Sequence, residues 1–185
     1  MNESMKISEL LNPLSVVANI KANDKESVLS ELADALLAVA PELQRDTVLH
    51  VLNEREQLGS TGIGEGVAIP HGKLKGIPQL MLAFGRSLDG LDFESMDGQP
   101  VHLFFLLLAP EDSVGIHLKT LARISKLLKN SDIRRQLMEA ADAEGIYQLI
   151  CDREDRSLSL GYFRFFKELG LYDCNDRAEY SRNSR

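Results

Sequence analysis

A glycine-rich segment that ends in a histidine, residues 59–73, carries the side chains best suited to chemistry. Its four glycines between 59 and 66 let the backbone approach a ligand closely, so that N–H groups could surround an anion. Pro70 fixes its own φ and disfavours a helical conformation at Ile69, so the short apolar strand 67–69 is expected to end there. His71 would then lie at a strand end beside an anion site, an arrangement that indicates phosphoryl chemistry.

Three residues of this segment, Ser60, Thr61 and Gly62, are candidates for phosphate binding through their hydroxyl and N–H groups. The competing interpretation is ordinary turn chemistry, in which the same groups hydrogen-bond to the local backbone. Pro-His-Gly triplets also occur in many turns. Local chemistry alone therefore leaves both a functional and a structural role open for His71.

A longer pattern around His71 resembles a known phosphorylation-site pattern. It consists of Glu56, six arbitrary residues, Ile63-Gly64, two arbitrary residues, and then Val67-Ala68-Ile69-Pro70-His71-Gly72. This resembles the type 2 enzyme IIA family of the bacterial phosphoenolpyruvate-dependent phosphotransferase system. The lead-in, residues 55–64, is most similar to the nitrogen-regulatory branch, and the resemblance covers roughly residues 5–155.

The resemblance implies roles for three residues. His71 would be phosphorylated through Nε2, with Nδ1 held by a backbone carbonyl or a side chain. Arg55 would pair with phosphoryl oxygens, although a surface ion pair with Glu54 or Glu56, of little energetic value, is the alternative. His117 would assist from the start of a helix, where the backbone favours anions, and its alternative role is that of a capping or half-buried histidine.

Four further charged or titratable residues have less certain roles. Glu65 departs from the uncharged residue expected in the nitrogen-regulatory branch, and its carboxylate would repel phosphate, point to solvent or tune partner choice. Lys73 would either attract phosphate or be a solvated surface charge. His50, on a helix surface, and His102, at a strand start, are assigned no role.

Composition limits the classes of function. The 185 residues suffice for one globular domain, and the net charge of −7 argues against a nucleic-acid partner. The longest apolar run, residues 103–109, is far too short for a transmembrane helix, and no secretory signal is evident. Two cysteines and four dispersed histidines indicate neither a disulfide framework nor a metal site. We expect a cytoplasmic protein that needs no cofactor.

Hydrophobic periodicity predicts alternating strands and helices. Residues 23–26, Asn-Asp-Lys-Glu, form a capping-box-like helix start, Pro41 ends the helix that follows, and Asp46 is expected to cap a second helix. We predict an α/β/α sandwich of the type 2 enzyme IIA kind, with a mixed parallel and antiparallel sheet of about five strands. The predicted strands are 15–22, 67–69, 80–85 and 101–109, and the predicted helices are 24–40, 46–56, 115–128, 131–140 and 143–151.

The chain divides into two parts of different composition. Residues 1–156 form the predicted enzyme IIA domain. Residues 157–185 hold six of the eleven aromatic side chains and end in a polar stretch. We interpret this C-terminal extension as having no part in the chemistry. A monomer or weak dimer is expected.

The function that the resemblance implies is that of a phosphohistidine carrier. It would accept a phosphoryl group on His71 from HPr or its nitrogen-type counterpart, and its phosphorylation state would regulate target proteins in nitrogen- or potassium-type control. One alternative is a fructose- or mannitol-type IIA component that passes the group to a cysteine of a IIB domain. Another is a binding module that uses His71 only for docking.

Overall fold

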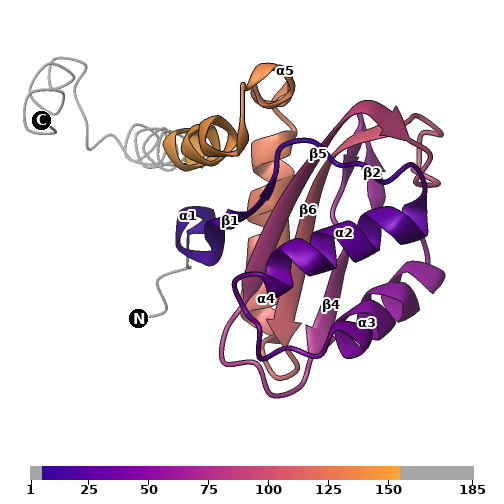
Figure 1. The fold of residues 1–185 in the computed structure, drawn as a ribbon, viewed down its shortest axis with the longest axis vertical. Helices are drawn as coiled ribbons and strands as arrows, with labels where there is room; N and C mark the ends of the chain where they lie inside the picture. Colours follow the sequence, from indigo (N-terminus) through magenta and orange to yellow (C-terminus); the bar gives the residue numbers. More distant parts are fainter. Residues whose placement is uncertain (1–5, 155–185) are drawn as a thin grey trace, which may run out of the picture.

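A mixed sheet lies between two layers of helices in the computed structural model, which describes residues 6–154 (Figure 1). The strand order is β1-β5-β6-β3-β2, and β4 also pairs with β6, so the prediction of a mixed sheet in an α/β/α sandwich is confirmed. The strands are β1 (Leu11–Val17), β2 (Gly62–Gly64), β3 (Val67–Ala68), β4 (His71–Leu74), β5 (Met81–Leu91) and β6 (Val101–Pro110). The helices are α1 (Ile7–Leu10), α2 (Lys25–Leu37), α3 (Arg45–Gln57), α4 (Val114–Leu128), α5 (Ser131–Glu139) and a last helix over 143–154.

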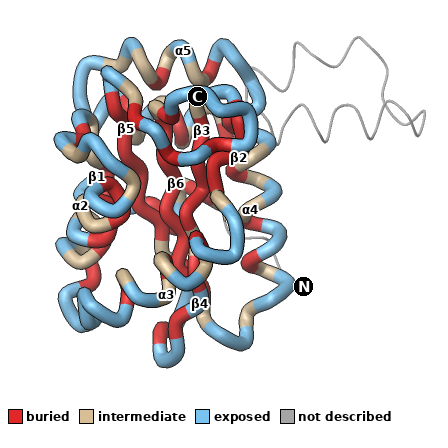
Figure 2. The backbone as a smooth tube through the Cα atoms, turned by 90° about the vertical axis from the view of Figure 1, so that its right-hand side faces the viewer, coloured by how far each residue is buried: buried red, intermediate tan, exposed pale blue. Residues whose placement is uncertain are grey.

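The central strand β6 organises the sheet. It pairs antiparallel with β5 and parallel with both β3 and β4. Most of its side chains are buried, and the tube in Figure 2 is red along this strand. A strand covered on both faces is expected to be apolar throughout, as the sequence of residues 103–109 predicted.

The sheet separates two apolar cores. Successive side chains of a strand point to opposite faces, so Phe104 and Phe105 enter different cores. Phe105 stacks edge-to-face on Phe84, with ring centroids 5.0 Å apart, on the side of α4, α5 and the last helix. Phe104 packs in the same way on Phe93, at 5.5 Å, on the side of α2 and α3. The site described below lies where the helical layers from both sides reach β4.

Helix starts were predicted with mixed success. Asp24 is the N-cap of α2, and its carboxylate accepts a hydrogen bond from Ser27 N at 2.8 Å. The second cap was placed wrongly, because α3 begins at Arg45 after Gln44, and Asp46 lies in the first helical turn. A carboxylate there still favours the positive end of the helix dipole. Helix α2 ends at Leu37, ahead of Pro41.

The first and third predicted strands have different bounds in the structure. Strand β1 covers Leu11–Val17 rather than 15–22, because a register irregularity after Leu11 accommodates Pro13. The predicted strand 80–85 extends to Leu91 as β5, because Gly90, with φ of 74°, lies in a register irregularity within the strand rather than in a terminating turn.

The strand expected to end at Ile69 ends at Ala68, as β3, but a new strand, β4, begins at His71. Residues of β3 and β4 lie in sequence along β6, with Ala68 opposite Phe104 and His71 opposite Leu107. Pro70 interrupts the ladder because it has no N–H, yet its carbonyl still accepts a bond from Leu107 N at 2.9 Å. His71 is therefore the first residue of β4 rather than the end of a strand.

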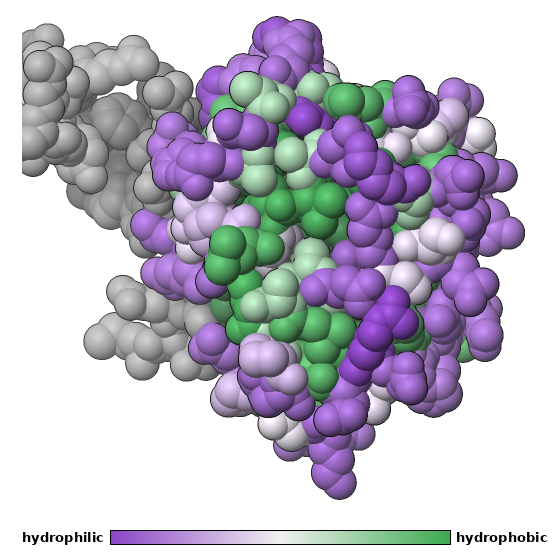
Figure 3. Space-filling view, viewed as in Figure 1, coloured by the Kyte–Doolittle hydropathy of each residue, from purple (hydrophilic) through white to green (hydrophobic). Residues whose placement is uncertain are grey.

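The outer surface of the domain is polar at its margins. Figure 3 shows polar side chains around the edge of one face and apolar side chains gathered near its centre. Among the exposed large apolar residues are Leu58, Val114 and Leu118. No helix within residues 6–154 is long and apolar enough to span a bilayer.

Helix α3 approaches β4 closely at Gly72. A Cβ atom added there would lie 3.0 Å from Val51 Cγ2 and 3.4 Å from the backbone carbonyl group of Val51. The tight contact is with the Val51 methyl group, whereas the backbone atoms lie at ordinary van der Waals distance. A β-branched side chain in a helix has little rotamer freedom, so a larger residue at 72 is expected to displace Val51 and the part of α3 that carries it. Helix α3 carries Arg55 at its C-terminal end.

We predict that Gly72→Ala lowers the free energy of unfolding by roughly 1–3 kcal/mol, the usual effect of overpacking. The matched control is Gly115→Ala in α4, where an added Cβ meets no atom within 4 Å. That change should leave stability unchanged or raise it by up to about 1 kcal/mol. Urea denaturation of both variants decides the matter, and equal stabilities would show that the close approach of α3 is not a constraint.

Candidate active site

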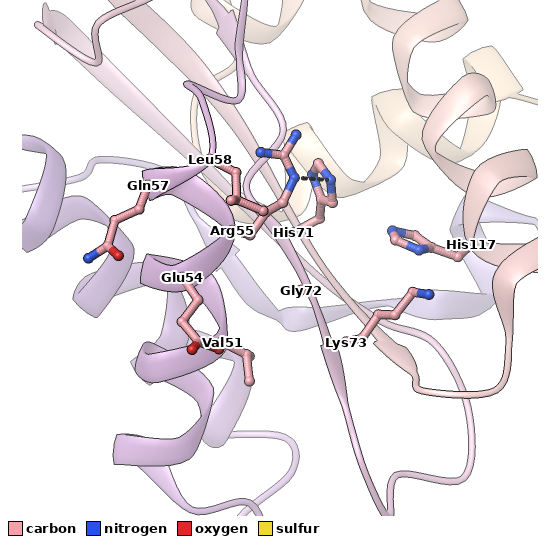
Figure 4. Close-up of a pocket in the computed structure, with 9 residues that line it drawn as sticks. All are labelled: Val51, Glu54, Arg55, Gln57, Leu58, His71, Gly72, Lys73 and His117. Carbon is pink, nitrogen blue, oxygen red and sulfur yellow. Dashed lines mark hydrogen bonds between the residues drawn. The ribbon is translucent and has the colours of Figure 1, made fainter.

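An open depression of about 690 Å³ lies between the end of α3, the start of β4 and the first turn of α4 (Figure 4). Its floor carries two histidines and its rim carries two cations. Three elements distant in the sequence therefore supply one site. The depression is lined by Val51, Glu54, Arg55, Gln57, Leu58, His71, Gly72, Lys73 and His117.

The His71 ring is held in one tautomer by two hydrogen bonds. Arg55 Nε lies 3.1 Å from His71 Nε2, and an arginine N–H can only donate, so Nε2 must be the acceptor. The ring proton is therefore on Nδ1, which donates to the Ile69 carbonyl at 2.7 Å. The neutral ring thus directs the lone pair of Nε2 toward the depression.

Arg55 reaches the depression from the last turn of α3, and Figure 4 shows its guanidinium beside the His71 ring. Besides its bond to His71, it donates from one terminal nitrogen to the Gly59 carbonyl at 3.0 Å. The alternative ion pairs with the neighbouring acids do not form. Glu54 lies 3.4 Å from His50, and Glu56 binds Lys25 at 2.9 Å. Arg55 is thus left with neutral acceptors alone among the described residues.

His117 faces His71 from α4. The two ring centroids are 5.5 Å apart, at an interplanar angle of 62°. His117 is buried, and its Nε2 has no hydrogen-bond partner in residues 6–154. A buried polar atom without a partner is rare, because it costs about 1–3 kcal/mol. His117 Nε2, beside the depression, therefore has an unused hydrogen-bonding capacity.

Burial and neighbouring cations keep both histidines neutral. Burial lowers the pKa of His71, the bond to Ile69 partly offsets this, and the charge of Arg55 lowers the pKa further. Burial also lowers the pKa of His117, together with His71, Lys73 and Arg55, to about 4. The permanent positive charge of the site is therefore on Arg55 and Lys73, while the imidazoles remain uncharged at neutral pH.

The three predicted phosphate-binding residues are not gathered with His71. Ser60 donates to the Phe93 carbonyl at 2.9 Å and accepts from Gly62 N at 3.1 Å. Thr61 is buried, and its N–H and hydroxyl both donate to the Glu56 carboxylate, at 2.9 and 2.6 Å. These hydrogen bonds occupy the donors within the loop, so ordinary loop chemistry describes them better than an anion cradle.

The structure also places the residues of uncertain role. Glu65 turns away from His71 and pairs with Arg134 at 2.9 Å. Lys73 lines the depression near His117, whereas His50 is on the exposed side of α3. His102 Nδ1 lies 3.0 Å from the Ser87 carbonyl, outside the depression. Of this group only Lys73 joins the site.

Sequence reasoning missed two kinds of residue at the site. Val51 and Leu58 provide apolar surface next to Arg55, and Leu58 is 85% exposed. An exposed leucine at a helix end was a signal for Leu58, but it went unused. Lys25, which neutralises Glu56, lies 31 positions earlier in the chain and gave no signal. In the part of the chain that the structure describes, no group of three or more potential ligands could hold a metal ion.

We predict that His117 titrates with a pKa of about 4 in the folded protein. Lys73→Met should raise that pKa, because it removes one of the cations that lower it. The matched control, Lys75→Met, changes a lysine two positions along that does not line the depression. Histidine ring resonances followed by NMR against pH provide the measurement, and an equal response to both variants would contradict the assignment.

The same low pKa fixes the sign of a stability change. The folded pKa lies below the ordinary 6.5, so protonation favours the unfolded chain. Stability from His117 is present above pH 6.5 and is lost as the pH falls toward 4, by roughly 2–3 kcal/mol. In urea titrations at several pH values, His117→Gln should lose less stability than the native protein over this interval. Parallel losses would contradict the low pKa.

The sequence matches a known protein family. Residues 9–152 match the family described as "Phosphoenolpyruvate-dependent sugar phosphotransferase system, EIIA 2". The nitrogen regulatory protein of Bradyrhizobium diazoefficiens is 45% identical over 146 residues, which cover 79% of this chain and 95% of that protein. The fructose-specific EIIABC component of Bacillus subtilis is 42% identical over 146 residues, 79% of this chain but only 23% of that longer protein.

A solved structure is similar in fold and in sequence. The crystal structure of the nitrogen regulatory protein IIA-Ntr from Neisseria meningitidis gives a TM-score of 0.73 at 35% identity, covering 78% of this chain and 98% of that one. The family match, the two relatives and the fold agree with the motif around His71. This chain belongs to the EIIA type 2 family of the phosphoenolpyruvate-dependent sugar phosphotransferase system.

Proposed function

We propose that this protein is a cytoplasmic phosphocarrier that accepts a phosphoryl group on His71 Nε2 from an HPr-type carrier, and that its phosphorylation state regulates other proteins. The observation that carries the proposal is the contact between Arg55 Nε and the acceptor nitrogen of His71, at 3.1 Å, in an open depression. A nucleophile and a cation for the transferred group are thereby side by side.

The transfer exchanges one phosphorus–nitrogen bond for another. The lone pair of His71 Nε2 attacks the phosphorus of the donor phosphohistidine, while the bond to the donor imidazole breaks and its electron pair returns to that ring. The Nδ1 proton stays on its bond to the Ile69 carbonyl and holds the ring in line. Arg55 exchanges its bond to Nε2 for bonds to the phosphoryl oxygens.

His117 and Lys73 complete the surroundings of the phosphoryl group. The unpartnered Nε2 of His117 is available to a phosphoryl oxygen, as a donor in the matching tautomer. Lys73 adds a flexible positive charge at the edge of the depression. Positioning and electrostatic stabilisation provide most of the catalysis in such transfers, so no metal or cofactor is required by this proposal.

The donor protein would dock on the apolar surface around the depression. Leu58 at the end of α3 and Val114 and Leu118 in α4 are exposed near the site residues of the same helices. Polar side chains such as Glu54 and Lys73 lie at its rim. An apolar centre with a polar rim suits a transient complex.

Similarity to nitrogen regulatory proteins favours regulation as the output of this site. The second candidate is a sugar-specific IIA component that passes its phosphoryl group to a IIB cysteine, which the similarity to a fructose-specific component supports. Rapid transfer from the phosphorylated protein to a fructose-type IIB domain, at a rate near that of acceptance, would favour the second candidate.

Phosphorylation itself can be tested by intact mass. We predict that incubation with phosphoenolpyruvate, enzyme I and HPr, or the nitrogen-type pair, adds one acid-labile phosphoryl group. His71→Ala should abolish the addition. His50→Ala is the matched control, since His50 is exposed on α3 outside the depression, and it should leave the addition intact.

Two results would contradict the proposal. Equal phosphorylation of the native protein and His71→Ala would place the phosphoryl group on another residue. No phosphorylation by either donor pair would instead indicate a binding module that uses His71 only for docking.

A further inference from the structure

Arg55 lies between two acidic residues in the sequence, yet neither of them pairs with it. A carboxylate on Arg55 would compete with a phosphoryl group for the guanidinium, because both bind its planar N–H donors. Within residues 6–154, two of the five N–H donors of Arg55 are occupied, and both of their acceptors are neutral. The question is what keeps the neighbouring carboxylates away, above all that of Glu56.

Glu56 is buried, and three groups hold its carboxylate. Oε1 accepts from Thr61 N at 2.9 Å and binds Lys25 Nζ at 2.9 Å. Oε2 accepts from the Thr61 hydroxyl at 2.6 Å. Both oxygens are thus occupied on the side of the helix end that faces α2 and the loop after α3. A buried carboxylate needs this degree of pairing to remain charged.

Lys25 supplies the neutralising charge from the first residue of α2. Its side chain is 22% exposed, lies 5.0 Å from the centroid of the Phe93 ring, and also binds Glu94 at 2.6 Å. Burial alone lowers the pKa of Lys25, but the bonds to Glu94 and Glu56 outweigh burial and raise the pKa above its usual value. Lys25 therefore remains a cation beside Glu56.

The same contacts fix the loop that holds Arg55. Thr61, which is hydrogen-bonded to Glu56, lies two residues after Gly59. The Gly59 carbonyl accepts a hydrogen bond from Arg55. Gly59 N in turn donates to the Glu56 carbonyl at 3.1 Å. The carboxylate is thereby drawn to one side of the chain and the guanidinium to the other.

We propose that Lys25 and Thr61 are positioning residues for phosphoryl transfer, which bind the Glu56 carboxylate and so leave the Arg55 guanidinium free for the phosphoryl group. This inference rests on the proposed function of His71. It assigns to Lys25, remote in the sequence and outside the depression, an effect on the transfer rate through Arg55.

A double-mutant cycle on Lys25 and Glu56 tests the inference. Lys25→Met leaves the buried Glu56 carboxylate without its cation, so that Arg55 becomes its substitute partner. The rate constant for phosphoryl acceptance should then fall roughly tenfold, which is the effect expected for losing one hydrogen bond to a charged group. In the Glu56→Gln background there is no carboxylate to release, so Lys25→Met should change the rate by less than about twofold. Lys21→Met, an exposed lysine nearby in sequence, is the matched control.

A second readout needs no phosphoryl donor. When Arg55 turns to Glu56, His71 loses both the bond to Nε2 and the nearby positive charge that lowers its pKa. Lys25→Met should therefore raise the pKa of His71 in NMR titrations of the unphosphorylated protein. In the Glu56→Gln background, by contrast, Lys25→Met should not change the pKa of His71: the double variant and the Glu56→Gln single variant should have the same value.

The outcomes separate this inference from the proposed function. If Lys25→Met slows transfer equally with and without Glu56, Lys25 acts through packing and the inference is wrong. If the native protein accepts no phosphoryl group, the proposed function fails, while the pKa of His71 still tests the control of Arg55. Should Lys25→Met fail to fold, Thr61→Val replaces it, since valine removes one donor to Glu56 and keeps the side-chain shape. A rate and a pKa of His71 unchanged in Thr61→Val would then overturn the inference.

Discussion

The break in the sheet at Ile69–Pro70 is the constraint on which the rest of the site depends. Proline has no N–H to continue the ladder, so β3 stops and β4 resumes along β6 after one interrupted step. In that step the Ile69 carbonyl is available to His71 Nδ1. One backbone contact therefore chooses the tautomer, orients the ring and directs the reactive nitrogen outward. Gly72, directly after His71, admits α3 close enough for Arg55 to reach that nitrogen.

The electrostatics of the site depend on keeping the Glu56 carboxylate apart from the cations that lie beside the two histidines. Burial and the nearby cations Arg55 and Lys73 lower the pKa values of the two histidines, which favours their neutral forms. The nearby carboxylate of Glu56 is neutralised on the far side of α3 by Lys25. The chain is acidic as a whole, with a net charge of −7, but the depression is lined by the cations Arg55 and Lys73. Local arrangement, rather than net charge, decides what this site attracts.

Much of the fold could be predicted from local sequence. The apolar run of β6 and the helix start at residues 23–26 depend on neighbouring residues, and periodicity or spacing reveals them. The centre of the site was reached through the resemblance of the motif around His71 to a known family, because local chemistry left the role of His71 open. The bounds of β1 and β5 could not be predicted, since register irregularities around Pro13 and Gly90 depend on pairing with other strands. Thr61 looked like a phosphate ligand because its partner, Glu56, becomes visible only when the loop folds back on α3.

A reversible carrier must bind a phosphoryl group well enough to receive it and loosely enough to pass it on. In the proposed function, the cations Arg55 and Lys73 would favour the phosphoryl group throughout. The neutral His117, whose Nε2 has no protein partner within residues 6–154, would add a bond only when the group arrives. The depression is open, and Arg55 contacts His71 there through a bond that a phosphoryl oxygen could replace. Weak closure of the site would thus suit a carrier that must both accept the group and release it.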